Sequence, residues 1–429
     1  MKVQIKKGLL IEALGKISEV STKALVPDYN YNGLTTVEVQ DKAVLFSGSN
    51  GQLCARYTIT STDDPSILTN NEPGVVTTDS LKFRDAVKCI ATEDDSAPLT
   101  VSIEKGSLII EDTFSKRKKR VKLPIEKYNH PKQDICCPDE GTSHVFESNH
   151  FSSAINTVAP FVSNRGYKIE YTMLLMHWVD KEVRFVCGNG ALFSVYTVNK
   201  HSNDEQGKSE KKRLMPVDQA LIINRLIPTS VDVKIIWTKH EYLYIEVGNL
   251  QLALKGVLSR DYIAYDTNAF RFDEAKAIID VKVDDLLEAT NVVNALRDKE
   301  REIQGEALSC FMETPSSDGL MKLSITDKLS KFQCEYEVPL TNFHDLGSQP
   351  SFRSLYANSF LQKPAASARH SYLRFYLIDE KGVMLVKDVE LGEKGSDGIS
   401  EVKDEEDGST LTFFFSDIHT TQEEYDDEE

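Results

Sequence analysis

The sequence contains no apolar run near the roughly 20 residues that a membrane-spanning helix needs. Its opening segment, Met1-Lys2-Val3-Gln4-Ile5, alternates like a β-strand and lacks the long apolar core of a signal peptide. No P-loop, GxSxG, HExxH or DxDxDG motif occurs, and the 9 histidines lack the spacing partners of a triad or metal site. We therefore expect a cytoplasmic protein that is not an enzyme and uses no metal or other cofactor.

The 7 cysteines form no CxxC pair, and most of them stand within apolar stretches. An odd and scattered set favours reduced thiols that act as small core residues. Structural zinc is the alternative, but the ligand spacing that it requires is missing. The cysteines are Cys54, Cys89, Cys136, Cys137, Cys187, Cys310 and Cys334.

Length and composition indicate a soluble globular protein of about three domains. The chain has 429 residues, of which 40% are hydrophobic and 27% charged. The net charge of −17 would, taken alone, speak against DNA binding. Much of it lies in residues 404–407 and in the tail 423–429, so the direction in which the basic residues face decides the question.

One pattern recurs at a period near 138 residues: an alternating apolar run, a turn at Asn or Asp, and a second alternating run. The turns fall at Asn50, Asn189 and Asp327, and alternation around such a turn predicts a β-hairpin. An amphipathic helix is expected before each hairpin, a second helix after it, and then another hairpin. The first helices are expected at 9–18, 150–162 and 284–296, the second helices at 79–90, 217–226 and 356–366, and the later hairpins at 99–111, 231–247 and 372–387.

This order predicts three similar α+β domains, each with two helices packed on antiparallel sheet. Pro364 should end or kink its helix early. Polar linkers near 128–142 and 265–268 divide the chain into domains 1–130, 143–264 and 269–418, followed by an acidic tail at 419–429. Two insertions, 201–213 and 392–409, are expected to be solvated loops.

The repeat order resembles that of the β subunit of bacterial DNA polymerase III, the sliding clamp. The similar segments are Met1-Lys2-Val3 with the following leucines, Leu45-Phe46-Ser47-Gly48-Ser49-Asn50, Leu123-Pro124-Ile125-Glu126-Lys127-Tyr128, and the stretch from Glu246 to Tyr262. The resemblance covers nearly the whole chain but is diffuse. It implies helices that line a central hole, sheets that form the outer wall, and a head-to-tail homodimeric ring.

A clamp holds DNA through its phosphates, without reading sequence. The resemblance places Lys23, Arg165 and Lys168 in segments that touch double-stranded DNA in the family. Ordinary solvated helix faces are the alternative for any single basic residue on the expected helices. The candidates there are Lys16, Lys82, Arg84, Lys88, Arg225, Arg297 and Lys299.

Lys116-Arg117-Lys118-Lys119-Arg120 with Lys122 is the densest basic run. An exposed strand near the end of the first domain, a DNA contact and a nuclear-import signal all fit it.

Clamps of this family bind polymerase and clamp loader through short peptides in an apolar groove, and large side chains usually anchor such peptides. Core packing is the alternative for the aromatic members of this set. The resemblance places the groove at Tyr171, Gly188, Gly190, Ala191, Leu192, Phe193, Val383, Thr412 and Phe414.

The sequence departs from the family at this groove. The usual Thr-Asp-Gly-His-Arg-Leu is Gly188-Asn189-Gly190-Ala191-Leu192-Phe193, and the Pro-Asp-Tyr-Arg-Arg segment is replaced around Asp261-Tyr262-Ile263-Ala264-Tyr265. We therefore expect partner peptides of divergent sequence, as for a phage-encoded clamp. Two other hypotheses stay open: a clamp-like interaction scaffold or transcription accessory that does not encircle DNA, and a hydrolase whose site has no recognisable motif.

Overall fold

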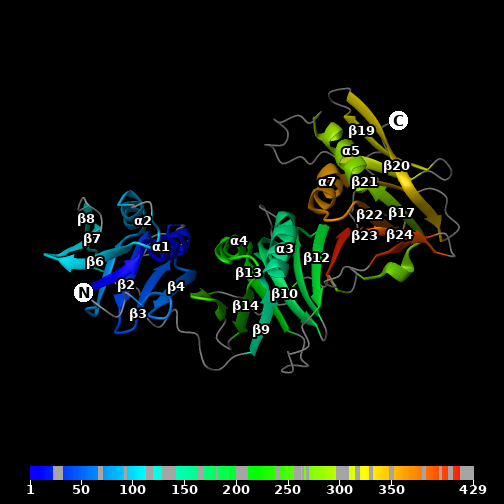
Figure 1. The fold of residues 1–429 in the computed structure, drawn as a ribbon. Coiled ribbons are helices and arrows are strands. Elements are labelled where there is room, and N and C mark those ends of the chain that lie inside the picture. Colours follow the sequence, from blue (N-terminus) through cyan, green and yellow to red (C-terminus); the bar gives the residue numbers. More distant parts are fainter. Residues whose placement is uncertain are drawn as a thin grey trace. The chain divides into compact units, whose positions relative to one another are not determined.

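The structure is a computed structural model of the chain (Figure 1). It describes residues 1–22, 32–65, 71–90, 94–112, 119–127, 142–162, 169–179, 182–190, 192–199, 211–237, 242–255, 262, 265–266, 270–295, 309–314, 319–327, 332–346, 352–378, 383–395, 399–403 and 409–415.

The first repeat has the element order β-α-β-β-β-β-α-β-β-β. Its elements are β1 (Lys2–Lys6), α1 (Lys7–Ser21), β2 (Leu34–Val39), β3 (Ala43–Ser49), β4 (Leu53–Thr60), β5 (Gly74–Asp79), α2 (Ser80–Cys89), β6 (Pro98–Glu104), β7 (Ser107–Asp112) and β8 (Lys119–Pro124).

The second repeat has the same order, with two short 3-10 helices added after its first helix. Its elements are β9 (Thr142–Glu147), α3 (Ser148–Val158), η3 (Ala159–Phe161), η4 (Ile169–Thr172), β10 (Met173–Val179), β11 (Glu182–Gly188), β12 (Leu192–Asn199), β13 (Lys211–Pro216), α4 (Val217–Leu226), β14 (Asp232–Trp237), β15 (Tyr242–Val247) and β16 (Leu250–Lys255).

The third repeat keeps the order and inserts two short strands before its last one. Its elements are η5 (Phe272–Glu274), β17 (Ala277–Lys282), α5 (Val283–Ala295), β18 (Ser309–Thr314), β19 (Leu320–Asp327), β20 (Phe332–Asp345), β21 (Phe352–Ala357), α7 (Asn358–Ser367), β22 (Tyr372–Leu377), β23 (Met384–Val389), β24 (Leu391–Lys394), β25 (Ser400–Val402) and β26 (Thr410–Phe415). The predicted fold, three similar α+β domains, is confirmed.

The predicted hairpin turns at Asn50 and Asn189 are confirmed, and the side chains explain them. The Asn50 Oδ1 accepts a hydrogen bond from the Leu53 N–H at 2.8 Å, and the Asn189 Oδ1 accepts one from the Leu192 N–H at 2.9 Å. Each asparagine thus replaces a backbone partner in the turn. Gly190, at φ 100°, takes the left-handed conformation that the second turn needs.

The six predicted helices are present, but their first and last residues differ in places from the prediction. The regular helix α3 stops at Val158, because Pro160 follows and the next turn is a 3-10 helix. The last helix was predicted to end early or to kink at Pro364; it does not end there, since α7 continues to Ser367. Pro364 is buried, and the Gln362 amide donates to the Asn291 Oδ1 at 3.0 Å, so packing against α5 offsets the lost backbone bond.

The chain forms two compact units. One contains β1–β9, α1, α2, α4 and β14–β16; the other contains β10–β13, β17–β26, α5 and α7. Among the described residues, the first unit holds an eight-stranded sheet in the order β5-β2-β3-β4-β16-β15-β14-β9 and a smaller sheet, β1-β6-β7-β8. The second unit holds a twelve-stranded sheet in the order β13-β10-β11-β12-β26-β23-β22-β17-β20-β19-β18-β21.

Helices cover one face of these sheets, in pairs. In the first unit α1 and α2 lie side by side, and in the second unit α5 and α7 do so (Figure 1). Leu10, Leu14 and Ile17 of α1 are buried against the sheet. A Cβ at Gly48 of β3 would lie 2.6 Å from a methyl carbon of Ile17, so this glycine permits the close approach of helix to strand.

The described parts of the insertion at 392–409, which was expected to be a solvated loop, are anchored instead. They contribute to the β24–β25 ribbon, and Ser400 and Ser409 are buried. The Ser400 carbonyl accepts a hydrogen bond from the Arg374 guanidinium at 2.7 Å, and the Ser400 hydroxyl accepts one from the Asn342 amide at 3.0 Å. Arg374 also binds Asp280 through two hydrogen bonds of 2.7 and 3.0 Å, so the ribbon covers a buried ion pair.

Candidate functional site

Four of the predicted groove residues meet at the turn between β11 and β12. A Cβ at Gly188 would lie 2.1 Å from the Phe193 ring, and a Cβ at Gly190 would lie 2.9 Å from the phenol oxygen of Tyr171. Each glycine therefore leaves the space that one aromatic ring occupies. Tyr171, on η4, is partly exposed, and its neighbour Ile169 is 52% exposed, which leaves an apolar rim beside the cluster.

Two more of the predicted groove contacts lie across the pairing of β12 with β26. Phe193 is the cross-strand partner of Phe414, and their rings are stacked with centroids 6.1 Å apart. Phe414 in turn faces Leu385 of β23. Both aromatic side chains are buried: Phe193 is 2% exposed and Phe414 is 4% exposed.

The remaining predicted groove residues are less informative. Leu192 and Thr412 are buried, and Val383 is partly exposed just before β23. Ala191 lies outside the described residues.

Sequence reasoning missed two tyrosines of the segment that follows β16. Tyr262 is 6% and Tyr265 1% exposed. The Tyr265 hydroxyl lies 2.6 Å from the Nδ1 of His177 on β10, which fixes this segment to the sheet. Burial raises the pKa of Tyr262 well above its usual value, and the neighbouring Cys187 and Tyr171 raise it further. Tyr262 therefore lies beside the groove cluster. The only signal in the sequence was that this segment departs from the family.

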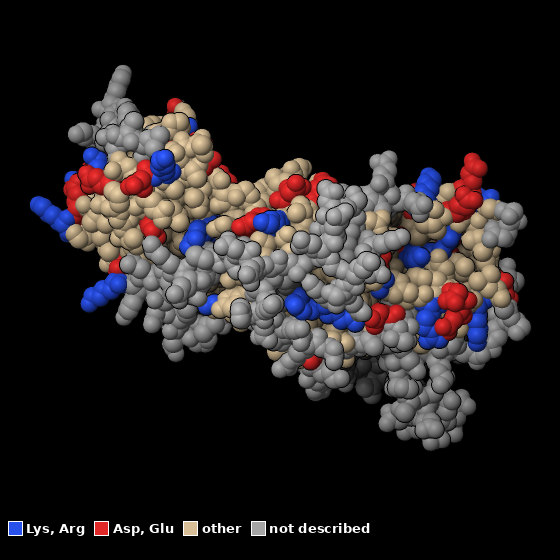
Figure 2. Space-filling view, turned by 90° about the horizontal axis from the view of Figure 1, so that it is seen from below, with Lys and Arg blue, Asp and Glu red and all other residues tan. Residues whose placement is uncertain are grey.

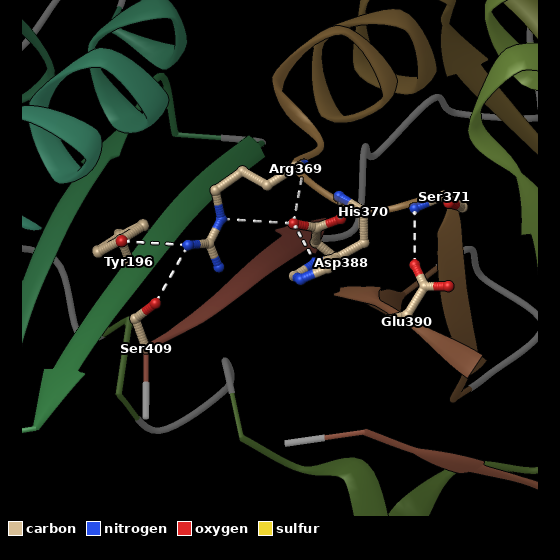
Figure 3. Close-up of polar contacts among 7 residues, drawn as sticks. All are labelled: Tyr196, Arg369, His370, Ser371, Asp388, Glu390 and Ser409. Carbon is tan, nitrogen blue, oxygen red and sulfur yellow. Dashed lines mark hydrogen bonds and ion pairs between the residues drawn. The ribbon is translucent and has the colours of Figure 1, made fainter. Parts of the chain in front are cut away.

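A polar network fixes β12 to the third repeat (Figure 3). Arg369, just after α7, donates to the Tyr196 hydroxyl at 3.2 Å and to the Ser409 hydroxyl at 3.1 Å. Its guanidinium also lies over the Tyr196 ring, 4.9 Å from the centroid. The buried Asp388 carboxylate accepts the backbone N–H groups of Arg369 and His370, both at 3.0 Å. This network holds together the strands that carry Phe193 and Phe414.

Two of the predicted DNA-binding residues lie on the solvent side of α2. Lys82 and Lys88 are exposed, and the Lys82 ammonium lies 3.9 Å from the Asp79 carboxylate at the helix start. Long exposed lysines can exchange one phosphate for another, as sequence-independent binding requires.

Three others are engaged by the protein itself. The Lys16 ammonium donates to the Leu226 carbonyl, and burial lowers its pKa although Glu12 acts in the opposite direction. Arg84 donates to the Ser18 hydroxyl at 3.3 Å, and Arg225 pairs with Glu19 at 2.8 Å. These contacts join α1 to α2 and α4. They reduce the charge that is available to DNA.

The other candidates, Lys23, Arg165, Lys168, Arg297 and Lys299, lie outside the described residues. Among the residues coloured in Figure 2, Lys and Arg are dispersed between Asp and Glu on the face shown, rather than gathered in one basic area.

The described part of the basic run lies on β8, the last strand of the smaller sheet. Lys119, Arg120 and Lys122 are exposed, and Arg120 pairs with Glu111 at 2.9 Å and also with Glu104. Of the three interpretations of the run, this geometry favours the exposed strand.

Two further searches cover only the described ranges. Within them, no three His, Cys, Asp or Glu side chains gather as a metal ion would require. Every helix there is too short or too polar to span a bilayer.

Comparison with known proteins relates the chain to others through its fold. No protein-family model matches the sequence, and no curated protein matches it either. The solved DNA polymerase sliding clamp from Bacillus subtilis is similar with a TM-score of 0.77 at 12% identity, covering 98% of this chain and 99% of that one. The DNA polymerase III subunit beta from Pseudomonas aeruginosa gives 0.75 at 14%, covering 97% and 100%. The beta subunit from Streptococcus pyogenes DNA polymerase gives 0.74 at 12%, covering 98% and 100%. The chain thus has the fold of the bacterial sliding clamps at very low sequence identity.

Proposed function

We propose that this chain is a DNA sliding clamp: a non-enzymatic processivity factor that pairs head to tail with a second copy and encircles duplex DNA. A partner polymerase would be tethered through a peptide bound at the groove. The observation that carries the proposal is a pair of strand edges, one in the first repeat and one in the third, that have no partner among the described strands.

Within the chain, successive repeats are joined by one kind of strand pairing. The strand β4 pairs antiparallel with β16, and Tyr57 faces Leu250. The strand β12 pairs antiparallel with β26, and Tyr196 faces Leu411. In each junction the third strand after the first helix of one repeat meets the last strand of the next.

The third repeat has the equivalent strand, β20. Tyr336 of β20 faces Leu323, just as Tyr57 faces Phe46 and Tyr196 faces Phe185. Among the described residues, β20 pairs with β19 over Phe332–Pro339 and with β17 only beyond that, which leaves its other edge open.

The first repeat has the complementary open strand. Among the described strands, β8 pairs only with β7. Lys119 is the first residue of β8 and pairs with Asp112, the last residue of β7. In the same way, Leu250 is the first residue of β16 and pairs with Val247, the last residue of β15. Pairing β8 of one copy with β20 of the other would therefore repeat the internal junction and remove two edges that are otherwise exposed.

The same equivalence predicts the register of that pairing. Because Tyr57 faces Leu250, Tyr336 would face Lys119, and the next pair would be Glu335 with Arg120. Both of these side chains are exposed, by 48% and 49%. Opposite charges at one cross-strand position favour this register and disfavour a slip of one residue.

Two copies joined in this way would contain six similar domains. A heterologous contact gives a closed ring when the rotation that relates one subunit to the next divides the circle evenly. The contact between copies would repeat the strand pairing of the two junctions within the chain. Lys82 and Lys88, together with the basic candidates outside the described residues, would contact phosphates within the ring.

The first test of this proposal is the molar mass in solution. Sedimentation equilibrium should give a value near twice the chain mass of 48.2 kDa. The second test is retention on DNA: the protein, loaded onto a nicked circle, should stay bound through a salt wash and leave when the circle is linearised. Equal loss from circular and linear DNA would overturn encirclement.

An interaction scaffold that does not encircle DNA is the second candidate. The net charge of −17, and the engagement of Lys16 and Arg225 by the chain's own groups, favour it. A scaffold predicts partner binding through the groove with no difference between circular and linear DNA.

A further inference from the structure

The hydroxyl of Tyr262 is buried and lacks a hydrogen-bond partner among the described residues. Nearly all buried hydroxyls in proteins are hydrogen-bonded, because leaving one unpaired costs about 1–3 kcal/mol. A phenylalanine would fill the same space without that cost. Among the described residues, no group uses this polar atom.

The surroundings of Tyr262 connect this atom to the groove. The ionisable groups that act on it electrostatically include Cys187, which precedes Gly188, and Tyr171, whose phenol lies against Gly190. Tyr171 is the partly exposed member of this group. An incoming chain would therefore approach the Tyr262 hydroxyl from the side of Tyr171.

Tyr265 provides the contrast, three positions further along. It is equally enclosed, but its hydroxyl is 2.6 Å from the His177 Nδ1, and the two rings meet edge to face at 5.9 Å. The hydroxyl of Tyr265 thus has a partner within the protein, whereas that of Tyr262 has none among the described residues.

We propose that the Tyr262 hydroxyl binds a polar backbone group of a partner's peptide, positioning an extended segment whose large apolar side chain packs at Phe193 and Phe414. An extended peptide offers unpaired carbonyl groups at every second position along one edge, and a phenol is a suitable donor to them. The inference rests on the proposed peptide groove and adds a residue that sets the peptide's position.

The probe is a linear 12-residue peptide, selected by display on the wild-type chain and counter-selected against Phe193→Leu. Its Kd is measured by calorimetry for Tyr262→Phe and for the matched control Tyr265→Phe, and the Tm of each variant is recorded without peptide.

We expect Tyr262→Phe to raise the Tm, because it removes the unpaired hydroxyl, and to weaken the peptide about tenfold, the effect of one lost hydrogen bond. Tyr265→Phe should lower the Tm, because the contact between the Tyr265 hydroxyl and the His177 Nδ1 is lost, and should leave the Kd unchanged. An unchanged Kd in Tyr262→Phe would overturn this inference while the groove stands. A lower Tm in Tyr262→Phe would also overturn it, since the hydroxyl would then have a structural partner such as a water molecule. A library that yields no peptide sensitive to Phe193→Leu would remove the groove and this inference together.

Discussion

Phe193 of β12 and Phe414 of β26 are cross-strand partners, and their stacked rings join the second repeat to the third. The contact is local to one sheet, but the two residues stand more than 200 positions apart in the chain. It is the structural centre of the proposed groove. It also contributes to the stability of the unit that contains it.

Replacing Phe414 with alanine should destabilise the second unit by about 3–5 kcal/mol, the usual cost of truncating a buried phenylalanine. Urea unfolding followed by near-ultraviolet circular dichroism would measure this. Val402→Ala, at a side chain 38% exposed, is the control and should change stability by less than about 1 kcal/mol. Equal effects of the two variants would show that Phe414 is not packed as described.

Charge reversal tests the proposed register between copies. Arg120→Glu should weaken dimerisation by about tenfold, because a glutamate would then face Glu335 across the pairing. Combining it with Glu335→Arg should restore much of the affinity, as measured by sedimentation velocity. Since Arg120 also contacts Glu104 and Glu111 within its own chain, the monomer stability of each variant is needed to complete the cycle. A double variant no better than the single ones would contradict this register.

Removing Lys82 and Lys88 should reduce retention on DNA and lower the slope of binding against salt by about one for each phosphate that is no longer neutralised. Lys16→Ala should have a smaller effect on that slope, since its ammonium is held by the Leu226 carbonyl. Lys42→Ala, at an exposed turn between β2 and β3, serves as the surface control. Salt slopes that are the same in all variants would exclude α2 from the DNA interface.

The Asp388 network predicts a specific loss of stability. Asp388→Asn should cost about 2–3 kcal/mol, because a buried carboxylate that accepts two backbone N–H groups becomes a neutral amide beside Arg369. Glu390→Gln, which affects only a 3.4 Å contact to the Ser371 N–H, should change little. Thermal unfolding of both variants at neutral pH measures the difference. Similar small shifts would mean that Asp388 contributes through packing alone.

Acid should release the segment that carries Tyr265 and Asp266. Burial raises the pKa of Asp266, but the hydrogen bond and charge of Lys212, 3.2 Å away, lower it more, so the net shift is downward. A carboxylate with a lowered folded-state pKa stabilises the protein above its ordinary pKa near 4, and this stabilisation is lost as the pH falls through the folded value. Asp266→Asn should therefore flatten the acid limb of a Tm-against-pH curve. An unchanged limb would show that other carboxylates dominate it.

The parts of the fold that depend on local sequence could be predicted. Asn50 and Asn189 form their turns through their own side chains, and the spacing between them revealed the repeat. The ends of helices were predicted less accurately where a proline allows two outcomes. Pro160 ends a regular helix, whereas α7 continues past Pro364 because it packs against α5.

The site was harder to predict because its contacts are distant in sequence. The resemblance indicated Phe193 and Phe414, but no local pattern shows that they are cross-strand partners, or that Lys16 is held by Leu226. For Tyr262 the sequence showed only that its segment departs from the family, since a buried tyrosine with a partner and one without look alike in a sequence. The basic residues counted in the sequence also did not show which of them are available to DNA, because ion pairs such as Arg225 with Glu19 form only after folding.

The pairing of β4 with β16 also has a consequence during synthesis. From the end of β4 at Thr60 to the start of β16 at Leu250, roughly 190 residues must leave the ribosome, which takes about 10–40 s at ordinary translation rates. Over that time one edge of β4 pairs with β3, while its other edge, along Leu53, Ala55 and Tyr57, stays unpaired. The strand β12 likewise precedes its partner β26 by roughly 210 residues. Slowing elongation between these strands should therefore increase aggregation of the newly made protein, and a chaperone that covers strand edges should reduce it.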